Sequence, residues 1–480
     1  MPETLKEKTA KGLFWGGLSN GVLQLLNLVF GIFLARILDV SDYGMVGIIT
    51  IFTLIATSLQ ESGFVAAIAN KKEVTHKDYN AVFWFSISTG LILYIILFFC
   101  APLIARFYNT PALIPFARYF FLGFLISSLG TAQYAYLFRN MKVKQKAVSL
   151  MFSLALAGFT GIILALAGFA YWGLATQSLV YIASLTVCYW YFSPWRPTFG
   201  FSFKPLRSMI GFSSKLLITN VFAHLNNNLF SVLLGRFYSE KAVGYFTQAN
   251  KWNSMGHSFI SEMLQGVAQP LFVQVEGDIQ RQRHVFRKTL RFAAFVSFPV
   301  MFGLSLIAKE LIVITITGKW LFAASILQIL CIGGAFHPIT RLYANLIISK
   351  GQSDVYMWNT IATCMVQLGA MLVSYRWDIE IMVIIYVGIN ICWLLVWHYF
   401  AWRSIGISLW DVLKDITPYL IIAAAIMIGV QWVASPIEDL HFALAAKAIM
   451  AAALYVGVMW LTNAVMFKEA IAFILKKKQR

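Results

Sequence analysis

The sequence predicts an all-α polytopic membrane protein with fourteen transmembrane helices, arranged as two parallel six-helix lobes followed by two C-terminal helices. Hydrophobic residues make up 59% of the chain and charged residues only 12%, and the mean hydropathy is +0.73, which is far from a soluble globular composition. Two further observations support this fold class: Lys and Arg are unevenly distributed between alternate loops, and the chain contains an internal repeat.

Apolar stretches of about twenty or more residues follow one another along nearly the whole chain, and each is long enough to cross a bilayer as a helix. The connections between them are too short for a separate soluble domain. The first stretch lacks the pattern of a cleaved signal peptide, so we expect it to be retained. The expected spans are roughly 13–38, 43–70, 79–104, 113–138, 147–169, 173–193, 209–237, 242–270, 292–316, 321–349, 355–375, 381–402, 415–434 and 443–467.

Positive charge gathers on one side of this predicted topology. The two termini and every second connection hold 26 Lys and Arg residues, whereas the other connections hold four. This asymmetry follows the positive-inside rule and predicts that both termini are cytoplasmic. The net charge of +18 therefore reflects orientation, with attraction to anionic membrane lipids as a consequence, and does not indicate nucleic-acid binding.

Two of the apolar stretches carry matching stripes of polar residues, offset by two hundred positions. At about 100° per residue, each stripe lies on one narrow face of its helix. Polar groups in hydrocarbon are costly unless they face protein or water, so we expect both faces to line one substrate cavity. The stripes consist of Asn20, Gln24 and Asn27 in the first stretch and of Asn220, His224 and Asn227 in the seventh.

The repeat also predicts the domain organisation. It recurs after an even number of spans, so the two halves have the same orientation in the membrane. A segment with three prolines separates them and is typical of a linker. We expect an N-terminal lobe at 1–193, a cytoplasmic inter-lobe linker at 194–208, a C-terminal lobe at 209–402, and helices 13 and 14 with a basic cytoplasmic tail at 403–480.

Cations outnumber acids within the expected spans. Each cation in the membrane centre costs about 2.5–3.5 kcal/mol on insertion scales, so a surplus suggests that an anion enters the cavity. Lys215 and Lys251 are the candidate cavity cations, although a lysine that snorkels to the interface would also explain Lys251. Glu61 and Glu262 are candidate sites for a coupling ion; for Glu61 an interfacial carboxylate is the alternative.

Three arginines are candidates for a gate or for contact with an anion: Arg36, Arg236 and Arg341. Arg36 and Arg236 are equivalent in the repeat and end their helices at the expected outer interface. A cation at a helix C-terminus is favoured by the helix dipole, so a purely structural role would also explain these two.

The sequence contains no signature of an enzyme, a cofactor site or a metal site. It has no P-loop and no GxSxG motif, and its outer loops are too short to build a catalytic site. The five cysteines lie in or at the ends of apolar spans without a CxxC pair, which is typical of small buried hydrophobic residues.

Several segments resemble the Wzx-type polysaccharide flippases, which belong to the multidrug, oligosaccharidyl-lipid and polysaccharide exporter superfamily. The resemblance covers nearly the full chain and rests on the segments LARILDVSDYG (34–44), VGYFTQANKW (243–252), SFPVMFGL (297–304), GKW (318–320) and ISKGQSD (348–354).

The resemblance implies two bundles that alternate between inward-facing and outward-facing states in a bacterial inner membrane. It implies that an undecaprenyl-pyrophosphate-linked oligosaccharide moves from the cytoplasmic to the outer leaflet. A pyrophosphate would suit the surplus of cations, and Asn, Gln and His would suit sugar hydroxyls. Polysaccharide polymerase and co-polymerase proteins are the partners that such a role implies.

Two other functions compete with this one. A cation-coupled multidrug exporter of the same superfamily would be expected to have twelve spans and an acidic chamber. A membrane enzyme such as a glycan polymerase or ligase would be expected to have a large outer loop. Fourteen spans, a cationic surplus and short outer loops count against both.

Overall fold

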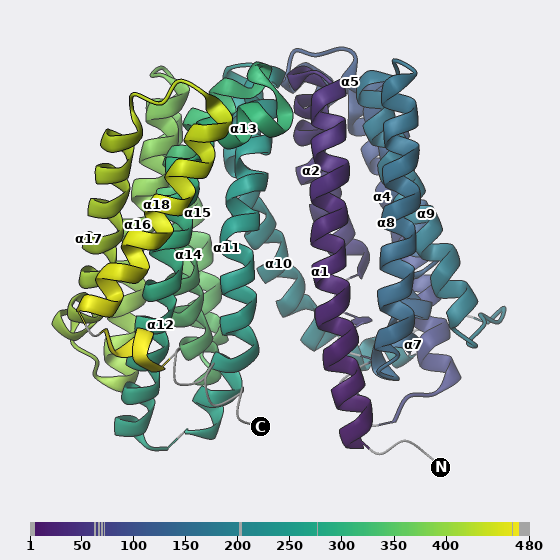
Figure 1. Ribbon diagram of the computed structural model, residues 1–480. Coiled ribbons are helices and arrows are strands. Elements are labelled where there is room, and N and C mark those ends of the chain that lie inside the picture. The colour runs from purple at the N-terminus through teal and green to yellow at the C-terminus, as the bar shows by residue number, and fades with distance from the viewer. Residues whose placement is uncertain are drawn as a thin grey trace. The chain divides into compact units, whose positions relative to one another are not determined.

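The computed structural model is all-helical over the residues that it describes: 5–61, 64–65, 68, 71, 73–200, 204–275, 277–462 and 464–469. Within these ranges the side chains of 5–14, 16–18, 60–61, 204–219, 265–270 and 273 are not described. The chain forms two compact units, Met1–Gly244 and Tyr245–Arg480. Figure 1 follows it from the purple N-terminal helices to the yellow C-terminal helices.

The first unit contains the helices up to α10 and the first turn of α11. Helices α8 and α9 lie side by side in it, and α8 also packs against α1 (Figure 1). The C-terminal half of α10 packs against α2 and against the end of α4. The helices are α1 (Leu5–Ile37), α2 (Val40–Glu61), α4 (His76–Phe107), α5 (Leu113–Phe120), α6 (Leu122–Ser128), α7 (Thr131–Arg139), α8 (Val143–Leu166), α9 (Ala170–Phe192) and α10 (Lys204–Phe237).

The second unit contains the rest of α11 and all the helices that follow. Helix α14 is its centre, because it packs against both α12 and α16, and most of its apolar side chains are buried. The helices are α11 (Glu240–Gln274), α12 (Ile279–Leu306), α13 (Ala308–Ile316), α14 (Leu321–Ser349), α15 (Ser353–Ser374), α16 (Ile379–Ile405), α17 (Leu409–Ala434) and α18 (Leu440–Leu461).

Ten helices in the described part of the chain are long and apolar enough to cross a membrane, or eleven if a bent pair counts as one span. The predicted spans 173–193, 209–237 and 242–270 coincide with α9, α10 and α11, which are not among these ten. The prediction of a multi-pass helical membrane protein is confirmed, and the exact number of fourteen spans stays a prediction.

The predicted span 113–138 is not one continuous helix. It is broken into α5, α6 and α7, with a bend of 46° between the first two and the third. Next to the bend, the Ser128 hydroxyl donates to the carbonyl of Leu125 at 2.7 Å, and Gly130 follows. Hydroxyls that bond back to the preceding turn bend helices, and glycine is a weak helix former.

The predicted linker 194–208 is ordered along its first half. Trp195 is buried among α4 and α7 side chains such as Phe83 and Ala135. Its indole N–H donates to His76 Nδ1 at 3.0 Å, and the backbone N–H of Thr198 donates to Asn80 Oδ1 at 2.9 Å. The linker therefore begins as a segment fixed to the start of α4, and α10 begins at Lys204, inside the predicted linker range.

The two trailing helices are held to α12 and α13 by charged and polar contacts. Arg287 binds Asp415 with an Nε–Oδ2 distance of 2.7 Å, which fixes α17 against α12. Lys447 binds Glu310 at 2.7 Å, which fixes α18 against α13. The Tyr455 hydroxyl donates to the carbonyl of Phe295 at 2.8 Å. These contacts make α17 and α18 integral parts of the second unit.

Candidate functional site

The two predicted polar stripes lie on helices α1 and α10 of the first unit. Their side chains do not belong to the buried core: all are exposed except His224, which is half-buried. The flank of each stripe does enter the core, where Phe30 of α1 and Phe230 of α10 are buried. Each helix therefore has one packed face and one accessible polar face, and the accessible residues are Asn20, Gln24, Asn27, Asn220 and Asn227.

Arg236 lies at the end of α10 and reaches the end of α4. Its Nη1 donates to the carbonyl of Phe107 at 2.9 Å, and its guanidinium lies 5.2 Å from the centre of the Phe107 ring. This contact joins the ends of α10 and α4. The equivalent Arg36 is also exposed at the end of its helix.

A second polar face is found in the second unit, where α11 meets α14. The rings of His257 and His337 lie with their centres 4.1 Å apart, and Ser261 Oγ is 3.4 Å from His337 Nδ1. Arg341 lies one turn after His337 on the same face of α14. On α11, Asn253 lies one turn before His257 and faces Gly334, where an added Cβ would be 2.3 Å from Asn253 Oδ1.

Two polar atoms along this face have no hydrogen-bond partner among the described residues. They are Asn253 Oδ1 and His257 Nδ1. Buried polar groups are nearly always hydrogen-bonded, so these two atoms are candidates to bind water or a polar ligand. The polar face runs along both helices and is built from Asn253, His257, Ser261, His337 and Arg341, which we call the α11–α14 ladder.

Lys251 lies on α11 two residues before Asn253, so at about 100° per residue it projects from another side of the helix than the ladder. It is half-buried, and the described part of the chain offers it no carboxylate within ion-pair distance and no hydrogen bond. Ten residues separate it from Ser261, so it lies roughly 15 Å from the Arg341 end of the ladder at 1.5 Å per residue. Lys251 and Arg341 therefore present positive charge at two different depths.

Other intramembrane cations are accounted for by local contacts. Lys447 is paired with Glu310, and both side chains are only 7% exposed. The guanidinium of Arg118 lies 4.1 Å from the centre of the Phe98 ring, and Lys309 is exposed. The surplus of charge inferred from the sequence therefore concentrates on Lys251 and Arg341 among the cations whose side chains the structure describes.

Three further predicted site residues are not part of the ladder or have side chains outside the described residues. Glu262 is exposed on α11, next to Ser261. The side chains of Glu61 and Lys215 lie outside the described residues, so their predicted roles are untested. Sequence reasoning missed His337 and Ser261. A signal was available, because His337 and Arg341 are four residues apart and share one face of a helix, as do His257 and Ser261.

A family profile described as "Polysaccharide biosynthesis protein" matches residues 33–325 of this chain. A similar curated protein is the lipopolysaccharide biosynthesis protein WzxC of Escherichia coli (strain K12), which is 24% identical over 75% of this chain and 74% of its own. Another is the teichuronic acid biosynthesis protein TuaB of Bacillus subtilis (strain 168), which is 24% identical over 93% of this chain and 92% of its own.

Two solved structures show the fold. The lipid II flippase MurJ in an inward closed conformation superposes with a TM-score of 0.76, covering 96% of this chain and 100% of that chain at 14% identity. An inward-facing multidrug resistance transporter of the MATE family of the MOP superfamily gives a TM-score of 0.66, covering 80% of this chain and 94% of that chain at 16% identity. The chain therefore has the fold that these transporters share.

Proposed function

This chain belongs to the family of polysaccharide biosynthesis proteins, and we propose that it is a flippase for a lipid-linked oligosaccharide. It moves an undecaprenyl-pyrophosphate-linked repeat unit from the cytoplasmic to the outer leaflet by alternating access, for the export of surface polysaccharide. The relatives that are named for lipopolysaccharide and teichuronic acid biosynthesis, and the fold shared with a lipid II flippase, support this assignment.

The observation that carries the proposal is the positive charge of Arg341 in the α11–α14 ladder and of Lys251 elsewhere on α11, for which the described residues offer no carboxylate partner. A cation left without a carboxylate inside a membrane protein is costly, and a diphosphate would offset that cost through charge-assisted hydrogen bonds. Because the two cations lie at different depths, they would meet the diphosphate in succession as it crosses. The amide, hydroxyl and imidazole groups of the ladder suit the sugar hydroxyls that follow.

We propose the architecture in fuller detail from the sequence. The chain has fourteen spans in two parallel six-helix lobes, 1–193 and 209–402, and two trailing helices, with both termini cytoplasmic. The stripes on α1 and α10 line the cavity for the oligosaccharide, and Lys215 would extend its positive charge. The partners are the lipid-linked substrate, membrane lipids, and the polymerase and co-polymerase that would receive the flipped unit.

Export of a small molecule is the alternative function, because the fold is shared with multidrug transporters. Exposed Glu262 beside Ser261 is the residue that favours this alternative, since a carboxylate at the ladder could bind a coupling cation. The two functions differ in how the charges of Lys251 and Arg341 would act on the transported molecule. A drug cation would be repelled by Lys251 and Arg341, whereas a diphosphate would be attracted.

Substitution of the two cations tests the flippase function. Lys251→Ala and Arg341→Ala should each reduce surface glycan about tenfold to a hundredfold, because a hydrogen bond to a charged group contributes about 1.5–3 kcal/mol. Lys251→Arg should retain partial function, since charge is kept. Surface glycan is measured by immunoblot in a strain that depends on this chain, with protein level in the membrane as the companion measurement.

Lys309→Ala is the matched control, because Lys309 is an exposed cation at the start of α13. It should leave surface glycan unchanged. Wild-type glycan in the Lys251→Ala/Arg341→Ala double variant would refute the proposed role of the cations, and accumulation of unflipped lipid-linked oligosaccharide inside the cell should accompany a true loss of flipping.

Thiol labelling tests the proposed topology. Single cysteines at Asn109 and Glu438 should react with an impermeant reagent added to intact cells, because both lie in connections with few positive charges. A cysteine at Gln145 should react only after the membrane is opened. Labelling of the Gln145 variant in sealed cells would contradict the fourteen-span arrangement.

A further inference from the structure

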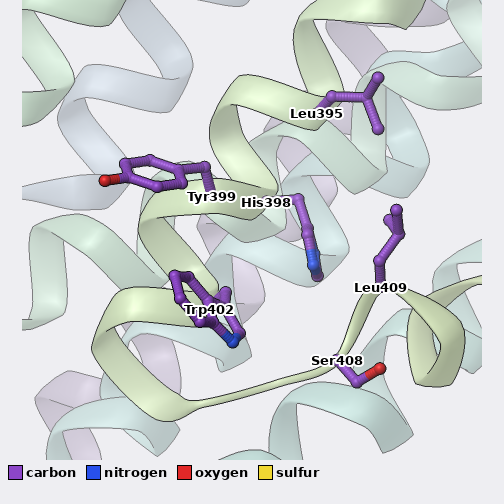
Figure 2. Close-up of a pocket in the computed structure, with 6 residues that line it drawn as sticks. All are labelled: Leu395, His398, Tyr399, Trp402, Ser408 and Leu409. Carbon is purple, nitrogen blue, oxygen red and sulfur yellow. The ribbon is translucent and has the colours of Figure 1, made fainter.

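A groove opens in the second unit where α16 ends and α17 begins, and its volume is about 430 Å³. Figure 2 shows α16 side chains on one wall and the turn into α17 on the other. The α16 residues recur at three- and four-residue spacing and so share one helix face. The lining residues are Leu395, His398, Tyr399 and Trp402 of α16, with Ser408 and Leu409 of the turn.

The groove combines a polar floor with an apolar, aromatic rim. His398 is buried, and its Nδ1 lies 3.2 Å from the Tyr343 hydroxyl of α14. Trp402 and Leu395 on the rim are 55% and 58% exposed. Aromatic side chains with one polar end are typical of the level of the membrane at which lipid headgroups lie.

The surroundings of the groove are positively charged. Arg403 follows Trp402 and is exposed, and Lys414 lies one turn into α17 with its Nζ 5.6 Å from the centre of the Trp410 ring. The acids nearby are already neutralised, because Asp411 and Asp415 form ion pairs with arginines of α12. Within the described residues, neither Arg403 nor Lys414 has a carboxylate partner.

We propose that this groove binds one anionic phospholipid of the leaflet predicted to be cytoplasmic. The acyl chains lie along Leu395 and Leu409, and the phosphate lies at the turn, within reach of Arg403 and of the Ser408 hydroxyl. Ser408 Oγ accepts the backbone N–H of Trp410 at 3.1 Å, which leaves its own hydrogen free to donate. A free inorganic anion would leave the exposed leucines and Trp402 in water, whereas a phospholipid covers them.

This site is separate from the proposed flipping of an oligosaccharide, and only the choice of leaflet uses the proposed topology. A lipid at this position would hold the last turns of α16 against α14 and α12, because His398 of α16 contacts α14 and Arg283 of α12 contacts the end of α16. Arg283 Nη2 donates to the carbonyl of Ile405 at 3.0 Å. The trailing helices would therefore be more stable when anionic lipid is present.

Lipid-dependent stability tests the site without any transport measurement. The purified full chain is placed in nanodiscs of phosphatidylcholine alone or with phosphatidylglycerol of the same acyl chains, and its melting temperature is measured. Phosphatidylglycerol should raise the melting temperature by several degrees, since a ligand that binds only the folded state stabilises it. The increase in melting temperature should be lost in the Arg403→Gln/Lys414→Gln variant. It should be kept in the control variant Arg376→Gln, which removes an exposed arginine just before the N-terminal end of α16.

A photoreactive residue provides a second measurement that does not depend on these charges. Placed at Trp402, it should cross-link phosphatidylglycerol; placed at Trp432, which is 81% exposed at the far end of α17, it should cross-link much less. Equal melting temperatures in the two lipids, an unchanged increase in the double variant, or equal cross-linking at the two tryptophans would each overturn the proposal. So would cross-linking at Trp402 that requires an added polyprenyl diphosphate.

Discussion

Lys447→Met is expected to lower the free energy of unfolding by about 3–5 kcal/mol, the usual effect of leaving one member of a buried ion pair without its partner. Lys447 Nζ lies 2.7 Å from Glu310 Oε1, and each side chain is only 7% exposed. The second oxygen of Glu310 has no hydrogen-bond partner among the described residues, so the lysine is the main compensation for its charge. Removing it leaves a buried carboxylate between α13 and α18 without a cation beside it.

The double variant Lys447→Met/Glu310→Gln is the control. It removes both charges, so it should recover most of the lost stability. Stability is measured as the melting temperature of the purified chain in one detergent, with the amount of folded protein in the membrane as a second measure. A double variant as unstable as Lys447→Met alone would contradict the ion-pair explanation and point to packing of the lysine stem instead.

The helices were predictable because hydropathy reports membrane burial directly, and over the described residues each predicted span lies on a helix or on a run of short helices. The breaks were not predictable from hydropathy. The bend before Gly130 depends on hydroxyl groups that bond back to their own helix, and such bonds do not change the apolar character of the stretch.

The candidate site was predictable only in part, because charge counts do not reveal pairs. Lys447 and Glu310 are 137 residues apart, and only the packing of α18 against α13 brings them together. The ladder depends likewise on which face of α14 meets α11. The sequence indicated polar stripes on α1 and α10 through their repeat, whereas His337 has no equivalent that would have marked it.

The repeat also contains two glycines whose contact could not be foreseen. Gly44 of α2 lies against the first residue of α11, where an added Cβ would be 1.8 Å from the carbonyl oxygen of Glu240. Gly244 of α11 lies against the first residue of α2, where an added Cβ would be 2.1 Å from the carbonyl oxygen of Val40. Positions 40 and 240 are equivalent in the repeat, as are 44 and 244, so the contact is reciprocal.

Gly44→Ala and Gly244→Ala are expected to force apart the beginnings of α2 and α11. In both cases the obstacle is backbone, which cannot turn aside as a side chain can, so the helices themselves must move. Overpacking of this kind costs about 1–3 kcal/mol. If the contact closes the outer end of the cavity in one state of an alternating-access cycle, the same free energy shifts the equilibrium roughly 5- to 150-fold toward the open state.

Accessibility of the α1 stripe is the measurement. A cysteine at Asn27 in the Gly44→Ala or Gly244→Ala background should react faster with an impermeant thiol reagent added from outside, and surface glycan should fall. Gly21→Ala on α1 is the matched control, because an added Cβ there has no atom within 4 Å, and it should leave the rate unchanged. In the Gly44→Ala/Gly244→Ala double variant, the cysteine at Asn27 should be labelled at nearly the same rate as in the single variant with the higher rate. Separating the helices once relieves both contacts, so the second substitution adds little. Two results would show that this glycine contact does not close the cavity. One is a labelling rate in both single variants equal to that with both glycines intact. The other is a double variant in which the two rate increases multiply.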